Sequence, residues 1–95
     1  MTLEELKQTD WYNERPSIIQ QAIDILPPTE MYKFKTSGKE CLIMSYEEPE
    51  SNDPKDVTIT VQKTGKGGVL EQLGLSSLDT NQVFGVKLDD LELAD

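Results

Sequence analysis

The most regular hydrophobic pattern in the chain lies between residues 14 and 26. Apolar residues recur there at helical spacings and fall on one wide face: Ile18, Ile19, Ala22, Ile23, Ile25 and Leu26. Pro16 stands in the first turn, where its missing N–H is not needed. Pro27–Pro28 ends the pattern, because a residue before proline disfavours helical angles. Residues 14–26 are therefore predicted to form an amphipathic helix that packs against another part of the molecule.

Residues 1–13 contain a weaker helical signal. Thr2 and Glu5 have the spacing of a capping box, in which each side chain satisfies a backbone N–H of the other residue. The helix that follows is short, and short helices are marginal in water unless they dock on a core. Trp11 and Tyr12 come next, in what the pattern indicates is a polar linker.

From residue 31 onwards the pattern changes to that of strands. Residues 31–35 alternate between apolar and polar, and residues 40–46 resume as an apolar run after turn residues, so the two segments are typical of a hairpin. Residues 57–61 are β-branched throughout and form the clearest predicted strand. Residues 82–87 also predict a strand, and Gly85 inside it is typical of a bend or bulge.

Two segments are predicted to be mobile loops. Residues 47–56 are acidic, contain two prolines and lack apolar residues, which favours an exposed loop. Residues 64–81 begin with a glycine-rich run and include a possible short helix. The chain is long enough for a single domain, residues 1–95, with the strands gathered in residues 31–93.

The order of these elements predicts an α+β fold. Helices come first and strands follow, which argues against a parallel α/β sheet. We expect the N-terminal helices to pack on a small, strongly twisted antiparallel sheet or on an SH3-like, partly closed β-barrel. Residues 83–93, VFGVKLDDLEL, combine a strand, a single turn and a last apolar pair. This segment resembles the closing segment of SH3-like barrels, a resemblance of architecture that spans roughly residues 31–93.

The charge of the chain restricts its partners. It carries 18 acidic and 9 basic residues, a formal net charge of −9. Because affinity for nucleic acid depends on neutralising phosphates, no direct nucleic-acid binding is expected. An acidic surface suits solubility, a basic protein partner or imitation of nucleic acid. The sequence has no apolar run long enough to predict a membrane span. Its acidic N-terminal segment is unlike a targeting peptide, so we expect a cytoplasmic protein.

Residues that perform chemistry are scarce. The chain has no histidine, which is the usual general base and metal ligand, and its single cysteine, Cys41, lies in an apolar run and is predicted to pack as a small hydrophobic residue. The acidic clusters lack the spacing of an EF-hand. We therefore expect a protein that is not an enzyme, with no catalytic residues, no cofactor and no metal.

The glycine-rich run KTGKGG raises the question of phosphate binding. It follows a predicted strand, as phosphate loops do, but the Lys and Ser/Thr of a P-loop do not follow its glycines. A flexible connection is the simpler interpretation. The alternative is a small anion-binding loop at Gly65–Gly68, with Lys63 and Lys66 beside it.

Two groups of residues are candidates for partner contact. Trp11 and Tyr12 belong to the types that dominate interfaces, although the same pair could simply cover the core. Lysines on neighbouring segments could form one positive patch, or could protect edge strands from aggregation. These lysines are Lys33, Lys35, Lys39, Lys63 and Lys66.

The leading functional hypothesis is a small acidic protein–protein interaction module that binds an unknown protein partner through its sheet face or through Trp11 and Tyr12. The alternative is a nucleic-acid mimic or inhibitor of a basic protein, of a kind encoded by phages or mobile elements, which would use residues 47–56 and 89–95. The third hypothesis is the small-anion binder at Gly65–Gly68.

Overall fold

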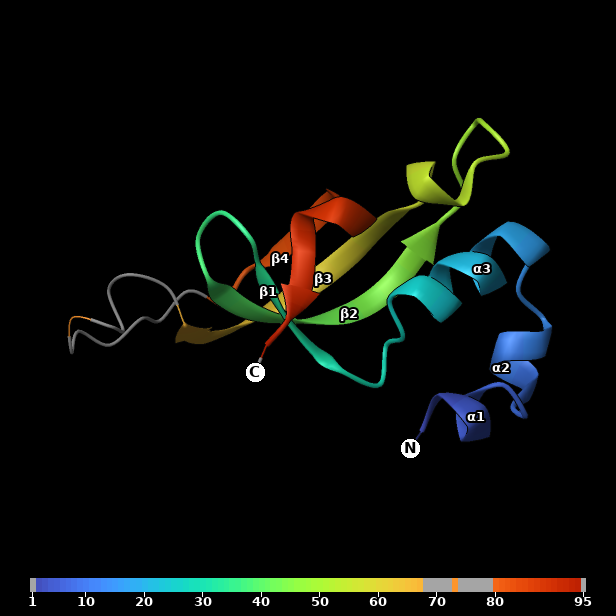
Figure 1. Cartoon of the computed structure of the whole chain (residues 1–95), viewed down its shortest axis with the longest axis horizontal. Coiled ribbons are helices and arrows are strands. Elements are labelled where there is room, and N and C mark those ends of the chain that lie inside the picture. Colours follow the sequence, from blue (N-terminus) through green and yellow to red (C-terminus); the bar gives the residue numbers. More distant parts are fainter. Residues whose placement is uncertain (1, 68–72, 74–79, 95) are drawn as a thin grey trace.

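The computed structural model describes residues 2–67, 73 and 80–94. In these residues short helices precede an antiparallel sheet, which confirms the α+β class (Figure 1). The helices are α1 Leu3–Leu6, α2 Asp10–Asn13 and α3 Ser17–Ile25. The strands are β1 Met31–Phe34, β2 Lys39–Glu47, β3 Thr58–Gly67, β4 Gln82–Lys87 and β5 Leu91–Leu93. Single 3-10 turns precede β3 and β5: η1 Pro54–Asp56 and η2 Leu88–Asp90.

Helix α1 forms where the capping box predicts it. The Thr2 hydroxyl accepts a hydrogen bond from the Glu5 amide at 3.2 Å and donates one to the Glu5 carboxylate, also at 3.2 Å. The segment predicted as a linker contains a second helix, α2, whose N-cap is Thr9; its hydroxyl accepts from the Tyr12 amide. Four residues are too few to produce a hydrophobic period, so the pattern could not reveal α2.

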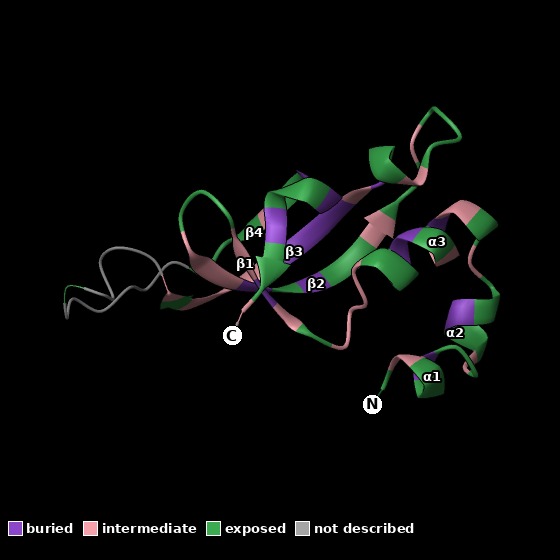
Figure 2. Ribbon diagram, viewed as in Figure 1, coloured by how far each residue is buried: buried purple, intermediate pink, exposed green. Residues whose placement is uncertain are grey.

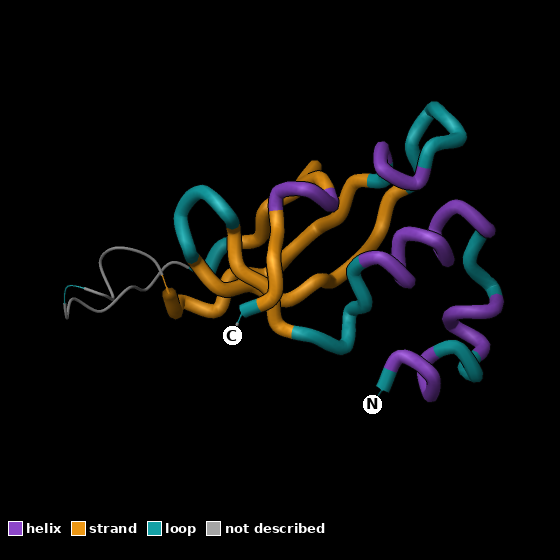
Figure 3. Tube along the Cα trace, in the orientation of Figure 1, coloured by secondary structure: helices purple, strands orange, loops and turns teal. Residues whose placement is uncertain are grey.

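Helix α3 lies within the predicted residues 14–26 and supplies much of the core. Ile19, Ala22 and Ile23 are buried, whereas Ile25 at the end of the helix is 54% exposed. The buried face is therefore narrower than the apolar face of the sequence. Figure 3 shows the three helices gathered at one end of the molecule, next to the end of β2.

The five strands have the order β4-β3-β2-β1-β5 and all pairs are antiparallel. Residues 31–34 and 39–47 form the predicted hairpin. Strand β5 pairs with β1, while β4 pairs with β3, so β4 and β5 are the two outer strands. The described residues of β4 and β5 do not pair with each other, so the sheet is open. The small antiparallel sheet is confirmed, and a closed barrel is not formed.

A bulge in β2 reverses the side-chain alternation near its end. Ile43 pairs with Val61 but Ser45 pairs with Thr60, so β2 advances two residues where β3 advances one. Without the extra residue, alternation would turn Tyr46 away from the core. With it, the Tyr46 side chain packs against the core and its hydroxyl donates a hydrogen bond to the carbonyl of Leu26, just after α3.

Strand β4 carries a second bulge at the predicted glycine. Val83 pairs with Val61 and Val86 pairs with Ile59, so β4 advances three residues where β3 advances two. Gly85 has a φ of 69°, in the left-handed region that glycine adopts readily. The prediction of a bend or bulge at Gly85 is confirmed.

Residues 64–67 belong to β3 and not to the predicted loop 64–81. Lys39 pairs with Gly67 and Cys41 pairs with Lys63, so β3 contains two extra residues here. Gly65 and Gly67 absorb this irregularity with φ values of 79° and 76°. The sequence suggested a flexible connection because glycines are rare inside strands, but here they belong to a bulge. The predicted helix after them lies outside the described residues.

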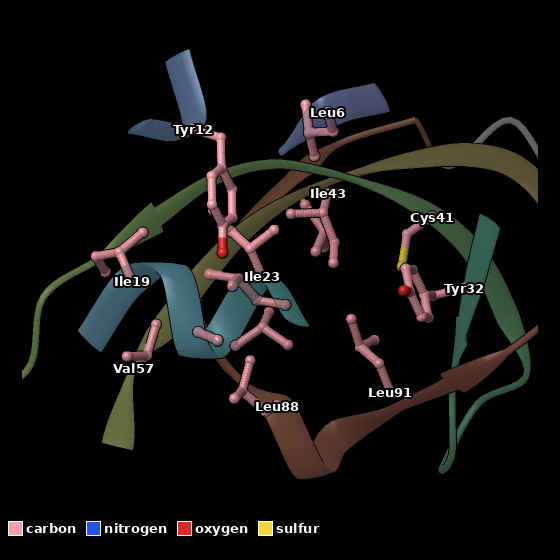
Figure 4. Packing of buried hydrophobic residues seen from close by; sticks show 14 residues of the cluster. Leu6, Tyr12, Ile19, Ile23, Tyr32, Cys41, Ile43, Val57, Leu88 and Leu91 are labelled. Atoms are coloured by element: carbon pink, nitrogen blue, oxygen red, sulfur yellow. The ribbon is translucent and has the colours of Figure 1, made fainter. Parts of the chain in front are cut away.

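The core fills the space between the sheet, α3 and the C-terminal segment (Figure 4). Figure 2 shows the buried positions concentrated along β3 and on one side of α3. Cys41 is fully buried, as predicted, and burial raises the pKa of its thiol to about 11. The buried apolar residues are Leu6, Tyr12, Ile19, Ala22, Ile23, Tyr32, Cys41, Ile43, Val57, Ile59, Val61, Val86, Leu88 and Leu91.

Candidate partner-contact surfaces

One side of the sheet carries large apolar side chains that face solvent. Cys41, Ile43, Ile59 and Val61 point into the core, so the residues between them point to the opposite side. On that side Leu42 is 39% exposed, Met44 56% and Phe84 71%. We call this surface the outer face and define it by Leu42, Met44, Ser45, Glu47, Thr60 and Phe84.

Thr60 lies at the centre of the outer face, between the two bulges. The extra residue of β2 falls beside Thr60, and the extra residue of β4 falls opposite the same threonine. Met44 and Phe84 therefore stand on either side of a short side chain that is only 7% exposed. Two exposed apolar residues thus surround one buried polar residue.

A carboxylate is fixed at the edge of this arrangement. The hydroxyl groups of Thr60 and Ser45 both donate to Oε1 of Glu47, each at 3.0 Å. Charge-assisted hydrogen bonds of this kind orient a carboxylate that would otherwise move freely on the surface. Glu47 is exposed, so its charge remains accessible to a partner.

The acidic segment 47–56 continues from this end of the outer face. Its residues are exposed or half-buried, and it ends in a defined turn, because Ser51 donates to the Asp56 carboxylate at 2.6 Å and the Lys55 amide donates to Asp53 at 2.9 Å. Turn η1 contacts α3 and η2. No group of three or more acidic, histidine or cysteine residues in the described part of the chain is arranged to hold a metal ion.

Trp11 lies on the surface of α2 and is paired with the single arginine of the chain. Its side chain is 38% exposed, and the guanidinium carbon of Arg15 lies 5.5 Å from the ring centroid. Arg15 Nε also donates to the Trp11 carbonyl at 2.9 Å, which keeps the guanidinium over the ring. The pair is an exposed aromatic and cationic surface.

Tyr12 belongs to the core and not to a contact surface. It is buried beside Leu6 and Ile19 in the hydrophobic cluster, and its hydroxyl donates to Asp24 at 3.4 Å. Gln20 donates to its carbonyl at 3.0 Å, which ties α2 to α3. Burial and the Asp24 carboxylate raise the pKa of Tyr12. Of the two interpretations of Trp11 and Tyr12, the burial of Tyr12 agrees with the one in which it covers the core, whereas Trp11 is exposed.

The lysines do not form the single positive patch that was one expectation. Cys41 in β2 pairs with Lys63 in β3 and with Tyr32 in β1. Because paired residues of neighbouring strands point to the same side of the sheet, these three side chains share the core face. Lys33 follows Tyr32 in β1 and therefore points to the other face, where it forms an ion pair with Glu92 at 3.7 Å. The expectation failed because the side of the sheet to which each lysine points depends on how the strands pair, and the sequence does not reveal this pairing.

The other three lysines of that group lie at strand ends, and Lys39 is the first residue of β2. Lys35 is exposed immediately after β1, and its amide donates to the Asp90 carbonyl at 3.0 Å. Lys66 is exposed between the two glycines of the β3 bulge. Of the proposed anion loop, Gly65 and Gly67 lie in β3, and Gly68 lies outside the described residues.

The comparisons with known proteins give no relative. No family model, no curated protein and no solved structure matches the chain. Among the described helices none is long and apolar enough to cross a membrane.

The residues of the outer face were not among those predicted to bind a partner. Leu42 and Met44 fall in the apolar run 40–46, which indicates a strand but not which of its residues face the core. Phe84 stands next to Gly85, and a glycine inside a strand indicates a bulge but not which of its neighbours faces outwards.

Proposed function

We propose that this chain is a small acidic, non-enzymatic protein–protein interaction module of the cytoplasm, which binds its partner through the outer face. The observation that carries the proposal is the exposure of Leu42 and Met44 on β2 and of Phe84 on β4, on one side of the sheet and on either side of β3. Apolar side chains scattered singly over a surface are ordinary, whereas a group of them is typical of a binding site.

The Trp11–Arg15 pair supports a second contact region. Tryptophan and arginine are enriched among the residues that contribute most to interface energy. The guanidinium stays over the ring because Arg15 is also bound to the Trp11 carbonyl, so little side-chain freedom remains to be lost on binding.

Affinity capture from a lysate of the source organism tests the proposal, with captured proteins identified by mass spectrometry and binding confirmed with the purified partner. We expect Phe84→Ser and Met44→Ser to weaken capture. Ile25→Ser serves as the control, because Ile25 is exposed to nearly the same extent as Met44 but lies on α3. If the wild-type protein captures no specific partner, the interaction function is wrong. If both substituted proteins still capture the partner as well as the wild-type protein does, the interaction function stands but the outer face is not the binding surface.

A nucleic-acid mimic, encoded by a phage or mobile element, is the second candidate. It is supported by the contact between η1 and η2, which brings the acidic segment 47–56 next to the acidic residues after β4. We expect duplex DNA to compete with this chain for a basic partner, and Glu48→Gln with Glu50→Gln to weaken binding more than Glu4→Gln with Glu14→Gln does. Binding that does not change with salt or with either pair of substitutions contradicts this candidate.

We also propose that the sheet is related to the SH3-like architecture. The support is the path of the chain after β4, which passes through η2 and then pairs with β1 at the opposite side of the sheet. A crystal structure in which β4 approaches β5 would favour this relation, and one in which the sheet is flat would exclude it.

A further inference from the structure

We infer that the partner segment bound by the outer face is basic and amphipathic: its apolar side chains cover Leu42, Met44 and Phe84, and a lysine or arginine pairs with Glu47. This inference rests on the proposed interaction function and specifies the chemistry of the partner. It joins an apolar surface and an oriented charge that the fold places side by side.

The apolar half of the surface follows from the strand pairing around Thr60, which is short and nearly buried. Met44 follows the core-facing Ile43 in β2 and Phe84 follows the core-facing Val83 in β4, so the two flank Thr60 on opposite sides. Leu42 lies on the same side of β2 as Met44 and extends the apolar area along that strand. A single strand or helix of a partner could contact all three side chains at once.

The charged half follows from the fixed carboxylate. Two hydroxyl groups hold Oε1 of Glu47, so a cation that arrives there meets an acceptor that is already oriented. The acidic segment 48–56 begins at the next residue and adds negative potential at this end of the outer face. A partner with basic residues beside its apolar ones is complementary to this combination.

The same charges argue against a second copy of the chain as the occupant. Each copy carries a formal net charge of −9, so bringing two outer faces together places two acidic segments close to each other. Lys87 is the basic residue in the same cross-strand row, because Thr58 pairs with both Glu47 and Lys87. Among the described residues Lys87 forms no ion pair with Glu47, so the carboxylate is not neutralised by it.

Three synthetic peptides of equal length test the inference against the full chain: one of leucine and lysine, one of leucine and glutamate, and one of serine and lysine. Each is titrated into the ¹⁵N-labelled protein, and amide shifts are followed by NMR. We expect only the leucine–lysine peptide to shift the amides of Leu42, Met44, Thr60 and Phe84 together. Equal shifts with the serine–lysine peptide would mean that charge alone binds, and would overturn the inference.

Substitutions then separate the two halves of the surface. Phe84→Ser should weaken the leucine–lysine peptide about 10-fold, as expected for a central apolar contact, while Ile25→Ser leaves affinity unchanged. Glu47→Gln should weaken it about 3-fold, because the amide oxygen still accepts from Ser45 and Thr60 but the charge is lost. Glu14→Gln, which removes one charge from the segment between α2 and α3, is the matched control, and Lys87→Gln should not weaken binding.

Other occupants give different results. Outer-face shifts that depend on protein concentration without any peptide would assign the face to a second copy. Shifts in residues 68–79 on Phe84→Ser, again without peptide, would assign it to the chain itself. Either result overturns the inference, as does the absence of binding by the leucine–lysine peptide. None of these results removes the interaction function, which fails only if the wild-type protein captures no partner.

Discussion

Two glycines with nearly the same backbone angle should respond very differently to alanine. Gly67 has a φ of 76° and Gly85 a φ of 69°, so an added Cβ strains both positions in the same way, by about 1–2 kcal/mol. At Gly85 the new methyl group meets no atom within 4 Å. At Gly67 it collides with the carbonyl oxygen of Gly38 and approaches the Glu40 amide nitrogen to 3.1 Å.

The collision at Gly67 involves backbone atoms, which cannot rotate out of the way as a side chain can. Forcing a methyl group into such a contact adds about 1–3 kcal/mol. We therefore expect Gly67→Ala to destabilise the fold by about 2–5 kcal/mol and Gly85→Ala by about 1–2 kcal/mol. Since a chain of this length has a stability of about 5–15 kcal/mol, Gly85→Ala should still fold, whereas Gly67→Ala removes a large part of that stability.

Urea unfolding followed by Trp11 fluorescence measures the difference, with the same slope expected for all three proteins. Amide exchange at Lys39 and Glu40 provides a local measure, because Gly67 pairs with Lys39. Equal destabilisation by the two substitutions would refute the reasoning. It would mean that residues 64–67 do not pack against the β1–β2 turn and behave as the loop that their composition suggests.

Three further predictions concern the core. Tyr46→Phe should lower the free energy of unfolding by about 0.5–1.5 kcal/mol, measured in urea, because it removes the hydrogen bond to Leu26. Ile23→Ala should lower it by about 2–5 kcal/mol, whereas Ile25→Ala on the exposed side of α3 should change the melting temperature little. Burial raises the pKa of Cys41 from 9.0 to about 11, so its contribution to stability is present below pH 9 and lost between about pH 9 and about pH 11. Cys41→Ala should unfold with a weaker dependence on alkaline pH, and an unchanged dependence would contradict this assignment.

Hydrophobic periodicity predicted most of the elements. The i, i+4 spacing of α3 and the alternation in residues 31–35 and 57–61 reflect burial on one face of each element. Helix α2 has only four residues, so a single cap at Thr9 is its whole signal. Glycine at positions 65 and 67 suggested a loop because the bulge that requires it depends on pairing with β2.

The candidate site was much less predictable than the fold. Whether Leu42 or Ile43 faces the core depends on which side of the sheet α3 covers, and alternation alone gives no preference. Tyr46 shows the difficulty most clearly, since one extra residue at the β2 bulge moves it from one face to the other. Trp11 and Tyr12 are neighbours of similar chemistry, and only the packing of α2 against α3 separates the buried one from the exposed one.

The two outer strands restrict how another protein can approach this sheet. Strand β4 is interrupted by the bulge at Gly85, and β5 consists of three residues with a charged glutamate at its centre. Irregular, short and charged edges are the devices by which sheets avoid being extended by foreign strands. A protein with such edges can keep an open sheet without growing into fibres, because its edges are poor templates for an added strand.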